Sequence, residues 1–220
     1  MKAIHLQFLL RGQKERAAFS LLELLCVMAV ISILAVTATQ SIRSSLEGYN
    51  LTGAADMVRA ELLLAKQTAL SRNMPVEVRF YKYTDITGDK WRLMALLIPA
   101  AVSGNSSDEW ITSGRMLPGN VVMEDSSEYS TVLSKALPLG SDKVAPWTAL
   151  ESSNAPRILQ GKSYVGFLFE SDGSTNLPNG QPWCLTLKNL QARPSGTGPT
   201  ANYVSLVIDA ATGSARSFQP

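Results

Sequence analysis

Cysteine and histidine are nearly absent from this chain of 220 residues. The two cysteines, Cys26 and Cys184, are too few for a disulfide framework, and we expect both to be single buried thiols. The one histidine, His5, lies near the N-terminus. A chain that lost its N-terminal segment would therefore have no histidine for Ser-His-Asp catalysis, Cys-His catalysis or a histidine-ligated zinc site.

Charged residues are also scarce, at 17%, and they are unevenly placed. Before Phe19 there is one acidic residue, Glu15, against four basic residues: Lys2, Arg11, Lys14 and Arg16. The remainder of the chain is close to neutral, so we expect no nucleic-acid partner. With 45% hydrophobic residues the chain can bury one sizeable core.

A long apolar run follows the basic leader. Residues 19–39 contain a single charge, Glu23, and as a helix they would be about 31 Å long, enough to cross a hydrocarbon core. No basic residue follows the leader until Arg43, which predicts a cytoplasmic N-terminus and an exported remainder.

Two other interpretations of this run are open. A secretory signal peptide could be cleaved after Val36-Thr37-Ala38, leaving a secreted soluble β-rich binding domain that starts at Thr39. A lipoprotein signal could end at Leu24-Leu25-Cys26, but the residue before such a cysteine is normally small, and here it is leucine.

Glu23 distinguishes these interpretations. An ionised carboxylate in mid-membrane costs about 3 kcal/mol, and such residues usually have a partner or a role. A generic signal peptide has no use for one. Cleavage between Ala18 and Phe19 would create an α-amino group one helical turn from this carboxylate, and the cut would supply the missing counter-charge.

The residues around this position resemble the signature of type IV pilins and of the pseudopilins of type II secretion systems: Arg16-Ala17-Ala18 followed by Phe19-Ser20-Leu21-Leu22-Glu23. The resemblance implies cleavage after Ala18 by prepilin peptidase, methylation of the Phe19 amine, and pairing of Glu23 with the N-terminus of a neighbouring subunit. It implies three partners, namely the peptidase and methyltransferase, other pilin or pseudopilin subunits, and the bacterial inner membrane, with the C-terminal head in the periplasm or in a filament. It implies no cofactor.

Weaker matches further along are similar to the minor-pseudopilin and pilin-assembly branch of the family. They are Arg59-Ala60 with Ala65, Ser71-Arg72-Asn73 with Pro75-Val76, Leu117-Pro118 with Val121, and Val165 with Phe167 before Asp172-Gly173. This pattern implies a minor rather than an abundant subunit.

Four segments are expected: a cleaved leader (1–18), a transmembrane and assembly helix (19–40), an amphipathic continuation of that helix (41–73) and a globular head (74–220). Helical spacing persists to Arg72, and Asn73 and Pro75 end the pattern. We expect the apolar stripe of the continuation to pack on a sheet, through Met57, Leu63, Leu64 and Leu70.

The head is predicted to be β-rich, which gives an α+β, pilin-like fold class with a long N-terminal helix packed on an antiparallel sheet. Alternation predicts a half-buried strand over 76–80 that pairs with 91–98 across a turn at 85–89. Five further strands are predicted, at 121–123, 164–169, 183–187, 203–208 and 215–218. Residues 126–160 have no strong period and are left unassigned.

We expect no catalytic or metal site and no enzymatic activity. The acidic pairs Asp108-Glu109 and Glu124-Asp125 are interpreted as solvated loop charges. Two aspartate pairings could bind calcium, but turn formation explains them better: Asp85 with Asp89, and Asp172 with Asn176. The four tryptophans are expected to fill the core: Trp91, Trp110, Trp147 and Trp183.

Overall fold

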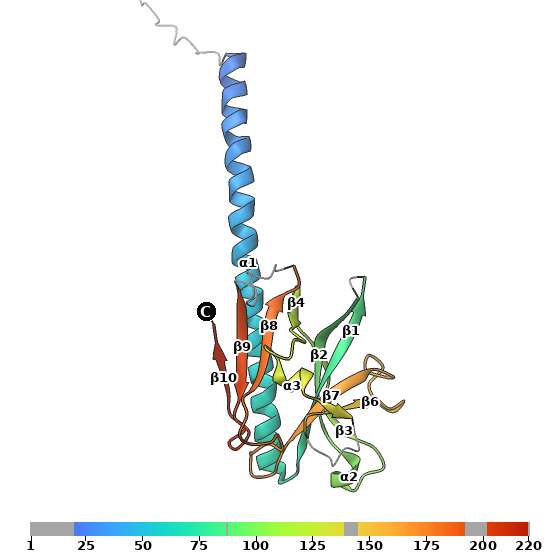
Figure 1. The fold of residues 1–220 in the computed structure, drawn as a ribbon. Coiled ribbons are helices and arrows are strands. Elements are labelled where there is room, and N and C mark those ends of the chain that lie inside the picture. The colour runs from blue at the N-terminus through green and yellow to red at the C-terminus, as the bar shows by residue number, and fades with distance from the viewer. Residues whose placement is uncertain (1–19, 87, 139–144, 192–201, 220) are drawn as a thin grey trace, which may run out of the picture. The chain divides into compact units, whose positions relative to one another are not determined.

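The computed structural model describes residues 20–86, 88–138, 145–191 and 202–219, and only the backbone of residues 37–44. Helix α1 spans Leu21–Arg72, 52 residues (Figure 1). The chain divides into two compact units, one up to Ser44 and the other from Ser45 onward. Gly48 and Gly53 lie within α1 and do not interrupt it.

Helix α1 ends in a Schellman-type cap. Asn73 has a left-handed φ of 52°, which takes the chain out of the helix. The N–H of Met74 then donates to the carbonyl oxygen of Ala69 at 3.3 Å, which satisfies one of the free carbonyls of the last turn. Pro75 follows and cannot continue a helix. The predicted helix end before Asn73 is therefore confirmed.

The face of α1 that packs on the sheet differs from the predicted stripe. Leu63 and Leu70 are about half exposed, at 53% and 48%, and Leu64 is 38% exposed, so only Met57 of the predicted set packs against the core. The buried face is built largely from small side chains: Leu51, Ala54, Ala55, Val58, Leu62, Ala65 and Ala69. Hydrophobicity alone favoured the leucines, but the alanines are the residues that the core covers, since Ala54, Ala65 and Ala69 are fully buried.

The head contains a ten-stranded sheet in the order β10-β9-β8-β4-β2-β1-β7-β6-β5, with β3 pairing with β2 beside β4 (Figure 1). All pairings are antiparallel except that of β5 with β6. The strands are β1 (Val76–Asp85), β2 (Gly88–Ile98), β3 (Glu109–Met116), β4 (Val121–Met123), β5 (Leu137–Pro138), β6 (Trp147–Leu150), β7 (Ser163–Phe169), β8 (Trp183–Asn189), β9 (Tyr203–Ile208) and β10 (Ala215–Phe218).

The α+β fold class, the hairpin and the five further predicted strands are confirmed. The structure adds strands β3, β5 and β6, which the sequence pattern did not indicate. It also adds two short helices, α2 (Ala100–Ser103) and α3 (Thr131–Ser134). Most of these additions lie in or near the segment that has no regular hydrophobic period.

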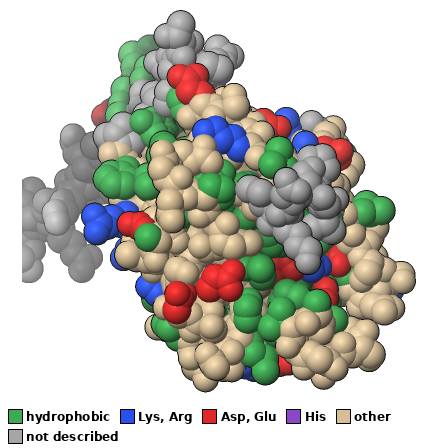
Figure 2. Space-filling view, turned by 60° about the horizontal axis from the view of Figure 1, so that its bottom comes forward, with side chains coloured by type: hydrophobic (Ala, Val, Ile, Leu, Met, Phe, Trp, Pro, Cys, Tyr) green, Lys and Arg blue, Asp and Glu red, His purple; other side chains and the backbone are tan. Residues whose placement is uncertain are grey.

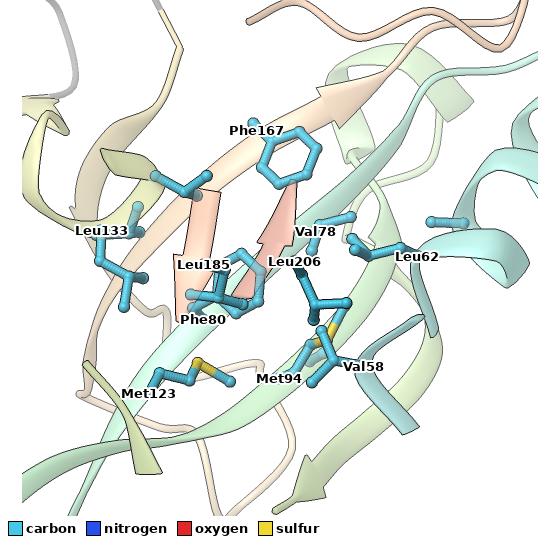
Figure 3. Close-up of a cluster of buried hydrophobic side chains, with 14 of the residues drawn as sticks. Val58, Leu62, Val78, Phe80, Met94, Met123, Leu133, Phe167, Leu185 and Leu206 are labelled. Carbon is cyan, nitrogen blue, oxygen red and sulfur yellow. The ribbon is translucent and has the colours of Figure 1, made fainter. Parts of the chain in front are cut away.

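One hydrophobic core joins α1 to the sheet. Figure 3 shows Val58 and Leu62 from α1 in the same cluster as Val78, Phe80 and Met94 from β1 and β2. Leu133 of α3 and Leu206 of β9 belong to the same cluster. Acidic and basic side chains are interspersed on the face of the molecule shown in Figure 2, in keeping with the near balance of charge.

The complete burial of Ala65 in the core predicts a sharp position dependence for alanine substitutions in α1. Ala65→Leu inserts a large side chain at a fully buried contact and should lower the free energy of unfolding by about 1–3 kcal/mol. The matched control, Ala60→Leu, lies on the exposed side of the same helix and should change it by less than about 0.5 kcal/mol. Chemical unfolding followed by tryptophan fluorescence measures both; equal losses would show that this helix face is not closely packed.

Glu61 is a charged residue on the buried side of α1. Its Oε1 forms an ion pair with Arg115 Nε at 3.0 Å, whereas the buried Oε2 has no hydrogen-bond partner among the described residues. Burial raises the pKa of this carboxyl, and the charge of Arg115 only partly offsets the effect. The protonated form is therefore favoured by folding.

The raised pKa of Glu61 gives a pH dependence with a definite sign. The stability linked to this proton is complete below the unfolded pKa of 4.5 and is lost as the pH rises through the higher folded pKa. Glu61→Gln should therefore become more stable relative to the wild type as the pH rises from about 4 to about 7. Urea titrations at several pH values measure this difference, with exposed Glu47→Gln as the control; parallel curves for wild type and Glu61→Gln would contradict it.

Candidate assembly site

Helix α1 begins with a side-chain cap made by Ser20. Its Oγ accepts a hydrogen bond from the backbone N–H of Glu23 at 3.2 Å, and its carbonyl accepts the first helical bond, from the N–H of Leu24, at 3.1 Å. The spacing Ser20-x-x-Glu23 is that of a capping box, in which serine and glutamate together satisfy free N–H groups of the first turn. The same residues that form the sequence signature therefore also start the helix.

Glu23 lies in the first turn of α1, where a carboxylate interacts favourably with the positive end of the helix dipole. That interaction is typically about 0.3–1 kcal/mol at an exposed position. Among the described residues the Glu23 side chain has no ion pair and is exposed. Its sequence-predicted companions, Ala18 and Phe19, lie outside the described residues.

The helix that follows Glu23 exposes apolar side chains all round. Every described side chain from Leu21 to Val36 is exposed. The large apolar ones have exposed fractions between 47% for Val27 and 82% for Leu21. A helix that is hydrophobic on all faces is normally buried against protein or lipid. Cys26 lies in this segment and is exposed, and Cys184 is half-buried, so the prediction of two buried thiols is wrong.

In the part of the chain that the structure describes, no helix has the combination of length and apolar character that a membrane crossing requires.

The acidic pairs of the head are bound separately to different partners. Glu109 forms an ion pair with Arg72, and Glu124 forms one with Lys188. Asp108 accepts hydrogen bonds from the N–H of Ala100 at 2.9 Å and from Arg79 at 3.2 Å. These contacts make three of the four acidic side chains parts of the fold, so the interpretation of the pairs as solvated loop charges is wrong for Asp108, which pairs with the buried Arg79.

The aspartates weighed as calcium ligands take part in turns. Asp172 Oδ1 accepts hydrogen bonds from both the N–H and the hydroxyl of Ser174, and these bonds lower its pKa. Asn176 Oδ1 accepts the N–H of Leu168, and Asp89 accepts the hydroxyl of Thr84. No group of three metal-ligating side chains occurs among the described residues.

A buried ion cluster in the head was missed by the sequence analysis. Residues Val76–Tyr81 of β1 are all buried, so the strand is covered on both faces and the prediction of a half-buried strand is wrong. Glu77 and Arg79, expected to face water, are only 3% and 6% exposed. Their spacing of two residues could have signalled a pair on one face, but their third partner, Glu151, is 72 residues from Arg79 in an unassigned segment.

Arg79 is the centre of this cluster. Its guanidinium donates two hydrogen bonds of 2.8 Å to Glu77, and two of 3.0 and 2.8 Å to Glu151. Tyr81 donates its hydroxyl proton to Glu151 at 2.7 Å. Burial raises the pKa of Glu77, although the bonds from Arg79 act in the opposite direction. Gly166 leaves room for the cluster, since a Cβ there would lie 2.9 Å from Glu77 Oε1.

Comparisons with known proteins bear on the start of helix α1. The sequence profile described as the prokaryotic N-terminal methylation motif matches residues 13–39, which include Ala18, Phe19 and Glu23. The recognition of a type IV pilin or pseudopilin signature is therefore confirmed. No curated protein matches the chain.

One solved structure that resembles the chain is the minor pseudopilin EpsH from the type 2 secretion system of Vibrio cholerae. The sequence identity is 14%, and the match covers 78% of this chain and 98% of that one, with a TM-score of 0.38.

The buried cluster predicts a large difference between two arginine substitutions. Arg79→Met leaves three carboxylates around an apolar side chain and should lower the free energy of unfolding by about 3–5 kcal/mol. Arg72→Met breaks the ion pair with Glu109, whose two side chains are 48% and 43% exposed, and should cost less than about 1 kcal/mol. Denaturant titrations compare the two; a loss at Arg79 as small as that at Arg72 would contradict a charge-paired interior.

Proposed function

We propose that this chain is a pilin-like structural subunit, incorporated as a minor component of a type IV pilus or of a type II secretion pseudopilus. The single observation that carries the proposal is the position of Glu23, one turn into an exposed apolar helix and inside the N-terminal methylation motif. The head is a folded β-rich domain that needs no contribution from the apolar segment for its core. The apolar segment is therefore available for contacts outside the chain.

The proposed pathway begins with the leader. Prepilin peptidase removes residues 1–18 by cutting after Ala18, and the new amine of Phe19 is methylated. Before assembly the subunit crosses the bacterial inner membrane once, with the leader on the cytoplasmic side and the head in the periplasm. Both the apolar exposure of Leu21–Val36 and the concentration of basic residues before Phe19 support this orientation.

In the filament, Glu23 is proposed to pair with the N-terminal amine of a neighbouring subunit. The apolar side chains around Glu23 would be buried among like helices, and an unpaired carboxylate in that surrounding would cost several kcal/mol. The amine created by cleavage is the nearest cation that processing supplies. Pairing with it would fix the axial register of neighbouring subunits, as a single buried polar group fixes the register of a coiled coil.

In the proposed assembly Ser20 and Glu23 have different roles: Ser20 caps the helix, and the side chain of Glu23 pairs with a neighbouring subunit. Ser20 Oγ satisfies the N–H of Glu23, so the backbone at this position does not depend on the glutamate side chain. The carboxylate of Glu23 is left exposed and can be used between subunits. Loss of the cap should weaken the first turn, typically by about 1 kcal/mol, without removing the charge.

The register role predicts that Glu23→Val leaves membrane insertion and cleavage intact but lowers incorporation into fibres by at least about tenfold, because the amine of the neighbour loses its partner. Immunoblots of sheared fibres against the membrane fraction give this ratio.

Two matched variants define the specificity of that result. Glu47→Val makes the same change at an exposed helix position outside the apolar segment, and Ser20→Ala removes the cap alone. Both should be incorporated at close to the wild-type level. Normal incorporation of Glu23→Val, or an equal defect in Glu47→Val, would overturn the proposed role of Glu23.

A further inference from the structure

A small surface pocket lies next to the buried ion cluster, and neither the fold nor the proposed assembly uses it. Its volume is about 250 Å³. Its walls come from the start of α2, from β3 and the loop before it, and from the loop after β6, through Ala100, Ser106, Ser107, Asp108, Trp110, Ser152 and Asn154. This volume is below the range of about 300–1,000 Å³ of pockets that hold drug-sized ligands, and it suits a single side chain.

Trp110 provides an aromatic wall of the pocket, since it packs against the core but remains only half-buried. Trp91, Trp147 and Trp183 are buried, as expected, at 8%, 8% and 1% exposure. Trp110 was expected to be buried too, but it is only half-buried and lines the pocket. Its ring already lies 5.7 Å from the guanidinium carbon of Arg79, so it contacts a cation within the chain. A tryptophan ring that is partly accessible is the side chain best suited to bind a second cation.

Asp108 belongs both to the ion cluster and to the pocket wall, so it places a negative charge at the pocket. Its side chain is 26% exposed, whereas those of Glu77 and Glu151 are 5% and 2% exposed. Its carboxylate is held in place by the N–H of Ala100 and by Arg79, so it is preorganised for a ligand. The pocket therefore has a fixed anionic wall beside an aromatic one.

The cluster has more negative than positive charge. Three carboxylates surround one guanidinium, and Arg79 is the only cation that pairs with Glu77, Asp108 or Glu151 among the described residues. A proton on Glu77, whose pKa burial raises, would still leave two carboxylates against one cation. A negative field in a recess with low-dielectric walls attracts cations to its mouth.

We propose that this pocket is a socket for an arginine side chain from a partner protein, which would stack on Trp110 and pair with Asp108. A planar guanidinium matches both walls, because it stacks on aromatic faces and binds carboxylates through two parallel hydrogen bonds. Arg79 already makes this pair of contacts inside the head, lying 4.4 Å from the Tyr164 ring while it pairs with Glu77. The inference concerns the head alone and does not rest on the proposed function.

The direct test is a titration of the full-length chain in detergent micelles with N-acetyl-arginine amide. The protein is labelled with 5-fluorotryptophan, and Trp110→Phe identifies the ¹⁹F resonance of Trp110. We expect a saturable shift of that resonance and little change in the other three. N-acetyl-citrulline amide has nearly the same shape without the charge and should bind at least about tenfold more weakly.

Three outcomes would overturn the proposal. They are equal binding of the citrulline compound, no saturable shift up to the solubility limit of the arginine compound, and a larger shift with N-acetylglucosamine, which would make the pocket a saccharide site.

Variants locate the binding at the socket. Ser107→Trp fills the pocket from its exposed rim without touching the ion cluster and should abolish the shift, whereas Ser127→Trp, at an exposed position away from the pocket, should leave it unchanged. Asp108→Asn should weaken binding by about tenfold. If that variant fails to fold, the comparison of the two tryptophan insertions decides, and persistent binding in Ser107→Trp would overturn the assignment.

Discussion

The contact between the small-residue face of α1 and the sheet is the interaction on which the head depends. The alanines at positions 54, 55, 65 and 69 are buried where α1 faces the core, and Val58 and Leu62 reach into the core beside β1 and β2. Because this face is narrow, the larger apolar side chains of the same helix are left outside. The head can therefore be complete while Leu63 and Leu70 remain about half exposed.

Two charged residues, Arg79 and Glu23, lie in apolar surroundings, and their charges are compensated in different ways. Arg79 is buried with its own partners, so its charge is compensated within the head. The charge of Arg79 is therefore fully paired once the head has folded. Glu23 lies in an apolar segment, and its carboxylate has no ion pair among the described residues, since Ser20 caps only its backbone N–H and the helix dipole supplies a partial positive charge. For Glu23, a full positive charge has to come from outside the described residues, and the proposed assembly supplies it by proteolysis.

Local patterns were sufficient to predict several parts of the fold. Alternation over 76–80 and the turn at 85–89 predicted the hairpin of β1 and β2, and Asn73 with Pro75 marked the end of α1 where the Schellman-type cap is found. The signature at the start of α1 could also be read directly, because its meaning depends on neighbouring residues in the sequence and on no distant contact. Each of these features depends on residues that are close together in the sequence.

Other parts depend on contacts that sequence spacing does not encode. Alternation could not tell that both faces of β1 are covered, because the cover comes from elements far along the chain. Glu151 joins Arg79 from a segment without a period, and Trp110 lies in β3, a strand of mixed polar and apolar residues. Hydrophobicity also predicted the wrong buried face of α1, because leucine is more apolar than alanine, whereas Ala65 and Ala69 are fully buried and Leu63 is about half exposed.

The central claim is that cleavage creates the cation that Glu23 requires. The most direct measurement is mass spectrometry of the N-terminal peptide of the protein purified from its native envelope. The account predicts a mature chain that begins with N-methylphenylalanine at Phe19. A chain that begins at Thr39, as a secretory signal peptide would leave it, or that retains its leader, would contradict the account.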